Sequence, residues 1–328
     1  MFNSQAMKNI LAAVARACEA VMMYYEGQRT GAALQVSTKA NNTPLTRADT
    51  AAHKLLAHAL FEATGLPVLS EEGEPIPYPQ RQLWPAYWLI DPLDGTKEFI
   101  AASGQFTVNV ALIAGARSVL GVVAAPCTGA IYCGVSVLYA HEAAQLTRVL
   151  KQAVTIGRLS CKASVSDWSA CANPSASSWD DILWTPIKTR AIAIGAEGVQ
   201  AGAIVALTSR AHHDEKADYL LRCLSSVRTK PVGSSLKMCL IAEGVADVYV
   251  RYGPTSEWDT GAAQAVLEGA GGKLADLDAK PLRYNQKASL LNPAFWASSG
   301  AFYLRVNDTA LVLNASESKR GELDANSD

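Results

Sequence analysis

The most apolar part of the chain, residues 106–140, is the feature that most limits how it can fold. Asn109, Arg117 and Pro126 interrupt this stretch, which is therefore too broken for a membrane span and is typical of several consecutive buried strands. Segments with helical spacing lie on both sides of it in the sequence. The mixed order of strands and helices predicts a layered α+β or α/β architecture in which helices cover the sheets.

Helices and strands outside this stretch follow from the spacing of apolar residues and from turn residues. Met7, Ile10, Leu11 and Val14 recur at three- and four-residue steps and predict a long first helix. Further helices are predicted over about 46–64 and 214–224, across LKMCLIAEG, and from Asp259 to the Gly271-Gly272 stop signal. Further strands are predicted at 67–70, 86–90 and 201–209, and across VADVYVRYG.

Composition excludes several classes of protein. The 328 residues are 49% hydrophobic and 18% charged, which is ordinary for one large or two closely packed globular domains. The net charge is −1 without a long basic run, so a nucleic-acid polymer is not an expected partner. Seven cysteines without a CxxC pair favour buried free thiols in a reducing compartment. We expect no transmembrane segment and a cytoplasmic location, with peripheral attachment to the inner membrane and a homodimer left open.

The segment WLIDPLDGTKEFI, residues 88–100, places two carboxylates at the end of an apolar strand. Pro92 fixes a sharp departure from the strand, and a tight turn can bring Asp94 back beside Asp91. If KEFI opens a short helix, the N–H groups of Gly95 and Thr96 form an anion site at its start. Two close carboxylates repel each other unless a hard cation such as Mg²⁺ lies between them. An ordinary surface turn explains this segment about equally well when it is taken alone.

Three more acids lie at the ends of predicted elements, where functional sites concentrate. Glu71 follows a strand, Asp259 stands at the start of a helix, and Asp49 lies in the first turn of the second helix. Each has a simpler explanation, because Asp49 fits a capping box with Thr46, Asp259 suits a helix N-cap, and Glu71 suits a solvated loop. Together with Asp91 and Asp94 they are better explained as one site.

The chain resembles the inositol monophosphatase superfamily of metal-dependent phosphatases, and within it the bacterial 3′(2′),5′-bisphosphate nucleotidases. The resemblance runs over about residues 5–295 with a gap at 140–200. The residues that carry it are KANNTPLTRAD, PVLSEE, YWLIDPLDGTKEFI, FTVNVALI, GVVAAP, LTSRAH, VGSSLKMCLIAEG and RYGPTSEWDT. It implies an αβαβα sandwich of the inositol monophosphatase and fructose-1,6-bisphosphatase type.

The resemblance also implies a metal site and roles for its residues. The implied ligands of two or more Mg²⁺ ions are Glu71, Asp91, the Leu93 carbonyl, Asp94 and Asp259. Glu71 and Thr96 would orient the attacking water, and Asp49 would be an alternative proton acceptor through a hydroxyl. The implied contacts to the substrate are Gly95, Thr96, Ser234, Ser235, Lys237, Arg251 and Asp259.

The implied reaction is hydrolysis of adenosine 3′,5′-bisphosphate to AMP and phosphate, which clears a by-product of sulfate assimilation and is sensitive to lithium. The turn DGTKEF favours this nucleotidase branch, because inositol monophosphatases usually have DGTTNF. Two alternatives stay open at this point: an inositol monophosphatase, and a catalytically silent member that binds metal or nucleotide.

The same reasoning divides the chain into four parts. We expect residues 1–135 to form an N-terminal α+β half with the metal site, and residues 190–300 to form a C-terminal α/β half with the substrate contacts. Residues 136–189 are expected to be an atypical insertion or loop, and residues 315–328 a disordered tail.

Overall fold

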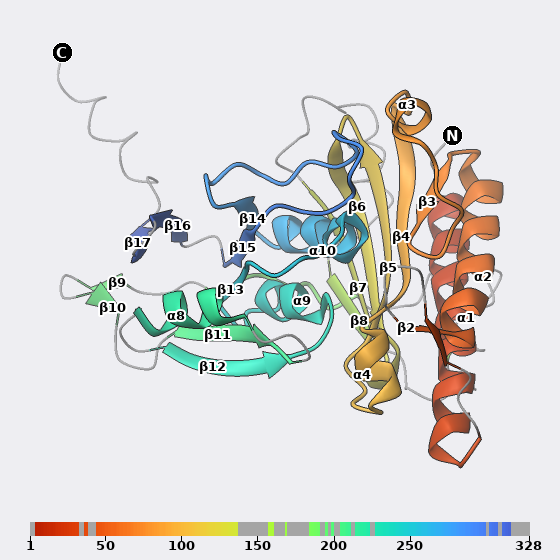
Figure 1. Ribbon diagram of the computed structural model, residues 1–328, viewed down its shortest axis with the longest axis horizontal. Helices are drawn as coiled ribbons and strands as arrows, with labels where there is room; N and C mark the ends of the chain where they lie inside the picture. The colour runs from red at the N-terminus through yellow and green to blue at the C-terminus, as the bar shows by residue number, and fades with distance from the viewer. Residues whose placement is uncertain are drawn as a thin grey trace.

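The structure is a computed structural model, and it shows five stacked layers (Figure 1). It describes residues 4–32, 36–38, 44–136, 157–160, 168, 184–190, 194–195, 198–199, 204–210, 214–223, 227–299, 302–307 and 310–315. Most of the predicted insertion at 136–189, and all but the first residue of the predicted tail at 315–328, lie outside these described residues. The division of the chain into halves stays a prediction.

The first layer consists of two long helices, α1 (Ser4–Arg29) and α2 (Arg47–Thr64). Between them lies a small hairpin of β1 (Val36–Thr38) and β2 (Pro44–Thr46). A capping box of Thr46 and Asp49 starts α2, and Gly65 ends it in the left-handed conformation with φ 68°. No helix in the described part of the chain is long and apolar enough to cross a membrane.

The second layer is a six-stranded sheet with its strands in the order β3-β4-β5-β6-β7-β8. These strands are β3 (Val68–Ser70), β4 (Ala86–Asp94), β5 (Thr107–Ala114), β6 (Arg117–Ala125), β7 (Ala130–Val135) and β8 (Gly157–Ser160). Strands β3 and β4 pair in parallel and the other neighbours are antiparallel. Strands β5, β6 and β7 confirm the prediction of consecutive buried strands in the apolar stretch.

Both faces of this sheet are buried, which explains why its strands are apolar at nearly every position. Trp88 and Ile90 of β4 pack in the same cluster as α1 and α2, whereas Tyr87 and Leu89 pack on the other side with α10. Short elements connect the strands: α3 (Tyr78–Arg81), α4 (Thr96–Ile100) and the 3₁₀ helix η1 (Pro126–Thr128). Among the described cysteines, Cys18, Cys133 and Cys239 are buried free thiols, as predicted.

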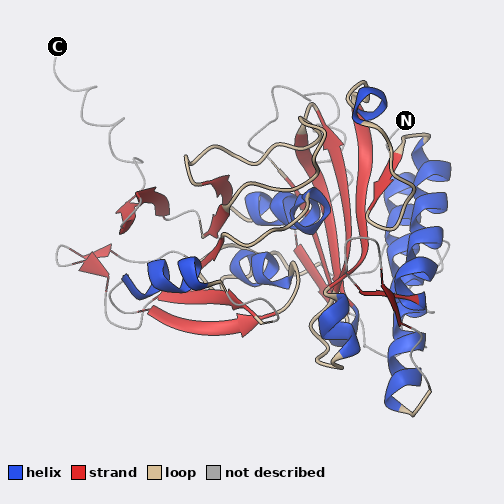
Figure 2. Ribbon diagram, in the orientation of Figure 1, coloured by secondary structure: helices blue, strands red, loops and turns tan. Residues whose placement is uncertain are grey.

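Helices α9 (Leu236–Ala242) and α10 (Glu257–Gly269) form the middle layer, between the two sheets (Figure 2). The second sheet has the strand order β12-β11-β13-β15-β14. Its strands are β11 (Ile204–Ser209), β12 (Val227–Val232), β13 (Val248–Arg251), β14 (Lys273–Asp276) and β15 (Phe295–Ser298). Helix α8 (Glu215–Cys223) covers its outer face.

Two small hairpins complete the described elements. They pair β9 (Ile194–Gly195) with β10 (Gly198–Val199), and β16 (Phe302–Asn307) with β17 (Ala310–Ala315).

The second sheet is also buried on two sides. Val205 and Leu207 of β11 pack toward the middle helices, whereas Ile204 and Ala206 pack toward α8. The order of layers is therefore αβαβα, as predicted. From β11 the chain adds β12 on one side and later β13 on the other, all three in parallel. In such sheets ligands bind beyond the carboxyl ends of the strands where the order reverses, which here are Ser209 and Arg251.

Helix α10 packs against the first sheet through two glycines. A Cβ atom added at Gly121 of β6 would lie 1.9 Å from the carbonyl oxygen of Ala262. A Cβ atom added at Gly134 of β7 would lie 2.5 Å from the Cα atom of Val266. Both contacts are with helix backbone, which cannot move aside as a flexible side chain does. The two glycines therefore fix how closely α10, and with it Asp259, approaches the sheet.

We predict that Gly121→Ala lowers the free energy of unfolding by about 1–3 kcal/mol, because the added methyl group forces α10 away from β6. Urea unfolding of the purified protein measures this change. Gly27→Ala in α1 is the matched control, because its added Cβ would meet only the Cβ of Ala32 at 3.7 Å and alanine is the better helix former. Equal unfolding midpoints for Gly121→Ala and the wild type would contradict this account.

Candidate active site

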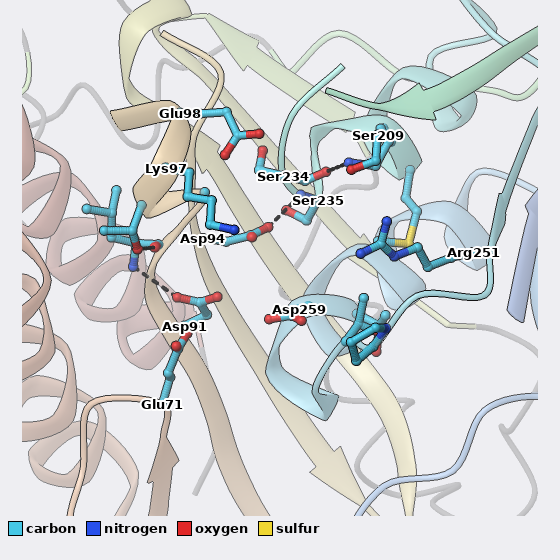
Figure 3. A pocket seen from close by; sticks show the side chains of 18 of the residues that line it. Glu71, Asp91, Asp94, Lys97, Glu98, Ser209, Ser234, Ser235, Arg251 and Asp259 are labelled. Atoms are coloured by element: carbon cyan, nitrogen blue, oxygen red, sulfur yellow. Dashed lines mark hydrogen bonds between the residues drawn. The ribbon is translucent and has the colours of Figure 1, made fainter. Parts of the chain in front are cut away.

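A cleft of about 210 Å³ lies where the end of β4 faces the second sheet and its turns (Figure 3). The site residues predicted from the sequence come together there, with one exception. Asp49 does not line the cleft and lies behind Thr96, to which it is hydrogen-bonded. The predicted residues that line it are Glu71, Asp91, Leu93, Asp94, Gly95, Thr96, Ser234, Ser235, Lys237, Arg251 and Asp259.

Three carboxylates from separate elements meet at one side of the cleft. Oxygen atoms of Glu71, Asp91 and Asp259 all lie within 4.8 Å of one another, and Figure 3 shows the three side chains converging. Glu71 directly follows β3, and its N–H donates to the carbonyl of Ile90 on β4. Since β3 and β4 run in parallel, their carboxyl ends bring Glu71 and Asp91 to the same edge of the sheet.

Asp259 reaches the cluster from the first turn of α10, and the predicted start of that helix is corrected here. The helix begins at Glu257 rather than at Asp259, because Ser256 is its N-cap. Asp259 occupies the third helical position, where Oδ2 accepts the Ser256 N–H at 2.8 Å and completes a capping box. One carboxylate oxygen is thereby held by the backbone, and the side chain is fixed toward the cleft.

A β-bulge separates Asp91 from Asp94. The pairing between β4 and β5 changes register between these two residues, so that both acids face the cleft. Oδ1 of Asp91 accepts the Leu93 N–H at 3.1 Å, whereas Oδ2 is buried with no hydrogen-bond partner among the described residues. A buried carboxylate oxygen without a donor is costly, and a cation bound beside it removes that cost. This atom fits a metal ligand.

The electrostatics of the cluster also favour a bound cation. Burial, and then the neighbouring carboxylates, raise the pKa of Asp91 and Asp259 well above the usual aspartate range. Burial raises the pKa of Asp94 to about 6, and the nearby Lys237 ammonium opposes this rise. A divalent cation stabilises ionised carboxylates that otherwise repel one another. The cluster can therefore hold metal.

Asp49 caps α2 and also contacts Thr96, a residue that lines the cleft. Its Oδ2 accepts the N–H of Thr46 at 2.8 Å, which is one half of the capping box, and it also accepts the Thr46 hydroxyl at 2.5 Å. Its Oδ1 accepts the Thr96 hydroxyl at 3.2 Å. Thr96 begins α4, and Gly95 precedes it with φ 91° as the N-cap. The Thr96 hydroxyl thus connects the cleft to a buried carboxylate.

The second sheet contributes the basic side of the cleft. Lys237 is buried, and its Nζ donates to the carbonyls of Ser234 at 2.8 Å and Val232 at 3.2 Å, which holds the turn before α9. Burial lowers the pKa of Lys237 to about 8. Arg251 ends β13 and packs on Gly253, where an added Cβ would lie 3.0 Å from the guanidinium carbon.

Several polar residues in and around the cleft were not predicted as site residues from the sequence. Thr107 and Asn109 of β5 lie beside Asp94, Glu98 lines the cleft, and Asp214 accepts the N–H groups of Tyr252 and Gly253 at 2.7 and 2.8 Å. The sequence pattern did contain an indication for Thr107 and Asn109. Threonine and asparagine at alternate positions of an otherwise apolar strand indicate one face that meets polar groups.

Comparison with known proteins agrees with this geometry. Residues 3–310 match the inositol monophosphatase family. The chain belongs to that family. It is 37% identical over 281 residues to the 3′(2′),5′-bisphosphate nucleotidases CysQ of Shigella flexneri and of Escherichia coli K12, which covers 85% of this chain and 94% of each relative.

Solved structures of the family have the same fold. The crystal structure of CysQ from Bacteroides thetaiotaomicron, described as a bacterial member of the inositol monophosphatase family, matches with a TM-score of 0.65 and 33% identity. That match covers 92% of this chain and 98% of the other. An inositol monophosphatase of Thermotoga maritima matches with a TM-score of 0.61 at 17% identity and covers 88% of this chain and 90% of its own, which supports the fold alone.

We predict that Asp91→Asn stabilises the metal-free protein at neutral pH, because burial and the neighbouring carboxylates raise the pKa of Asp91 and so make its ionised form unfavourable in the folded state. Adding Mg²⁺ should raise the melting temperature of the wild type more than that of this variant. Thermal unfolding in EDTA and in excess Mg²⁺ measures both effects. Asp278→Asn, an exposed surface change, is the control and should alter neither result. A less stable metal-free Asp91→Asn protein with a full response to Mg²⁺ would refute this assignment.

Proposed function

We propose that this protein is a Mg²⁺-dependent phosphomonoesterase that hydrolyses adenosine 3′,5′-bisphosphate to AMP and phosphate. The observation that carries the proposal is the arrangement of one cleft, with the carboxylates of Glu71, Asp91 and Asp259 on one side and the cations Lys237 and Arg251 on the other. A substrate with two phosphates needs both sides. The 37% identity to CysQ nucleotidases over most of the chain supports the same choice.

The donor set suits Mg²⁺, and we infer that two or more ions bind. The ligands would be carboxylate oxygens of Glu71, Asp91, Asp94 and Asp259 together with the carbonyl oxygen of Leu93, and hard cations prefer oxygen ligands of this kind. When bound, such ions make water a better nucleophile and stabilise negative charge on the departing oxygen.

The residues around the metal site would position water and the reacting phosphate. Glu71 and the Thr96 hydroxyl orient the attacking water. Asp49 is hydrogen-bonded to that hydroxyl and would be an alternative acceptor of the proton through it. The N–H groups of Gly95 and Thr96, at the start of α4, hold oxygens of the phosphate that is cleaved.

The opposite side of the cleft would bind the phosphate that is kept. Lys237 and Arg251 supply positive charge there, while Ser234 and Ser235 form the turn between β12 and α9. Asp259 contacts the substrate from the metal side. Inositol 1-phosphate has no second phosphate for these cations, so their charge favours the bisphosphate. We further propose a cytoplasmic role in clearing a by-product of sulfate assimilation.

A comparison of substrates tests the function. We expect phosphate release in Mg²⁺ to be at least about tenfold more efficient, as kcat/KM, with adenosine 3′,5′-bisphosphate than with inositol 1-phosphate. Added lithium should inhibit the reaction. A higher kcat/KM for inositol 1-phosphate would favour an inositol monophosphatase, and nucleotide binding without phosphate release would favour a silent family member.

We predict that Asp94→Asn lowers kcat/KM by at least about 100-fold while circular dichroism remains that of the wild type, because one metal ligand is lost without a change of side-chain size. Malachite-green detection of phosphate measures the activity. The Asp278→Asn control should retain full activity. Near-normal turnover by the Asp94→Asn enzyme in Mg²⁺ would defeat the proposed metal role.

A further inference from the structure

The face of β5 that points toward α10 and the turn at 233–235 begins with polar side chains and continues with the apolar Ala111 and Ile113, although the whole strand is buried. Residues two apart in a strand project to the same side, and Gln105, just before the strand, continues the row of Thr107 and Asn109. Thr107 is 0% exposed and Asn109 is 1% exposed. Buried polar side chains need hydrogen-bond partners, and here the partners come from the turn at 233–235 and from Asp94.

Two N–H donors converge on one oxygen of Asp94. Its Oδ2 accepts the N–H of Ser235 at 2.6 Å and an Nδ2–H of Asn109 at 3.4 Å, and the Thr107 hydroxyl lies 3.4 Å from the same oxygen. With Oδ2 occupied in this way, Oδ1 is the oxygen that can serve as a metal ligand. The orientation of the Asp94 carboxylate is thus set by groups outside the acidic cluster.

Asn109 also holds the Ser235 side chain. The Ser235 hydroxyl donates to Oδ1 of Asn109 at 2.8 Å and lies 2.8 Å from the Thr107 hydroxyl. An amide is the one small side chain suited to this place, because its NH₂ donates to Asp94 while its oxygen accepts from Ser235. A carboxylate could not donate, and an apolar residue could do neither.

Gln105 anchors the other end of the same turn. Its Oε1 accepts the N–H of Gly233 and the Nε of Arg210, each at 2.9 Å. A Cβ added at Gly233 would lie 2.6 Å from the Gln105 carbonyl oxygen, so the turn and the segment before β5 approach as closely as glycine permits. The row of Gln105, Thr107 and Asn109 therefore holds the turn at 233–235 at two points.

We propose that Asn109 is a positioning residue that orients the Asp94 carboxylate for metal binding and ties it to the turn at 233–235. The assignment of Asp94 as a metal ligand rests on the proposed function. The consequence is specific: Asn109 controls metal affinity without contacting the metal or the substrate. Residues that hold a metal ligand in this way change metal affinity about 10–100-fold when they are replaced.

The experiment compares three variants with the wild type. Asn109→Ala removes both hydrogen bonds of the amide, and Thr107→Val removes only a hydroxyl while keeping the side-chain shape. The matched control is Ser136→Ala, because Ser136 is equally buried and donates at 2.6 Å to Glu268, at the far end of α10. Each substitution removes a buried hydrogen bond, but only Asn109 and Thr107 lie beside Asp94.

Isothermal titration calorimetry with Mg²⁺ alone gives the metal affinity without any substrate. We expect Asn109→Ala to weaken Mg²⁺ binding at least about tenfold and Thr107→Val to weaken it less, while Ser136→Ala stays within about twofold of the wild type. Excess Mg²⁺ should restore most of the kcat of Asn109→Ala but not that of Asp94→Asn. Urea unfolding in EDTA checks that Asn109→Ala and Ser136→Ala are similarly destabilised.

Wild-type Mg²⁺ affinity in Asn109→Ala would overturn the proposal, and so would an equal loss in Ser136→Ala. If Asn109→Ala does not fold, Thr107→Val decides: weaker binding supports the proposal and unchanged binding overturns it. If the wild type binds Mg²⁺ and hydrolyses the bisphosphate, but the Asn109→Ala and Thr107→Val variants bind Mg²⁺ with normal affinity, only this inference is wrong. A wild type that binds no Mg²⁺ defeats the proposed function, and this inference fails with it.

Discussion

Carboxylates buried together at the end of β4 repel one another, and the elements around them hold them in place against that repulsion. Burial and neighbouring acids raise the pKa of Asp91 and Asp259, so ionising both without a cation is costly. The chain nevertheless holds them together, with a parallel strand pair at Glu71, a bulge after Asp91 and a capping box at Asp259. Acidic side chains that the fold holds close together, although their charges repel, are typical of a functional site.

The two sheets and the elements next to them supply opposite charges to the same cleft. The first sheet carries most of the acids, whereas the second sheet and α9 carry Arg251 and Lys237. Asp94 lies between them, since it belongs to β4 but accepts the Ser235 N–H from the other side. Metal binding and recognition of a second phosphate would therefore depend on one another through this carboxylate.

Much of the site could be predicted from the sequence because it lies in local patterns. DPLDGT places two acids and an N–H pair within six residues, and the five-layered fold followed from the family resemblance. The start of α10 was misjudged because a capping box puts its acid at the third helical position rather than at the cap. Asn109 was missed because its partners, Asp94 and Ser235, are 15 and 126 residues away in the chain.

Contact between α10 and the glycines of β6 and β7 also bears on how such a site changes in evolution. Where backbone meets backbone, there is no layer of side chains that can be repacked, so the position of Asp259 tolerates almost no drift. The turn after β13 differs, since a Cβ added at Gly253 would meet the flexible Arg251 side chain rather than backbone. A change at that turn can therefore be accommodated by a moving side chain, whereas a change at the contact of α10 with β6 and β7 displaces Asp259.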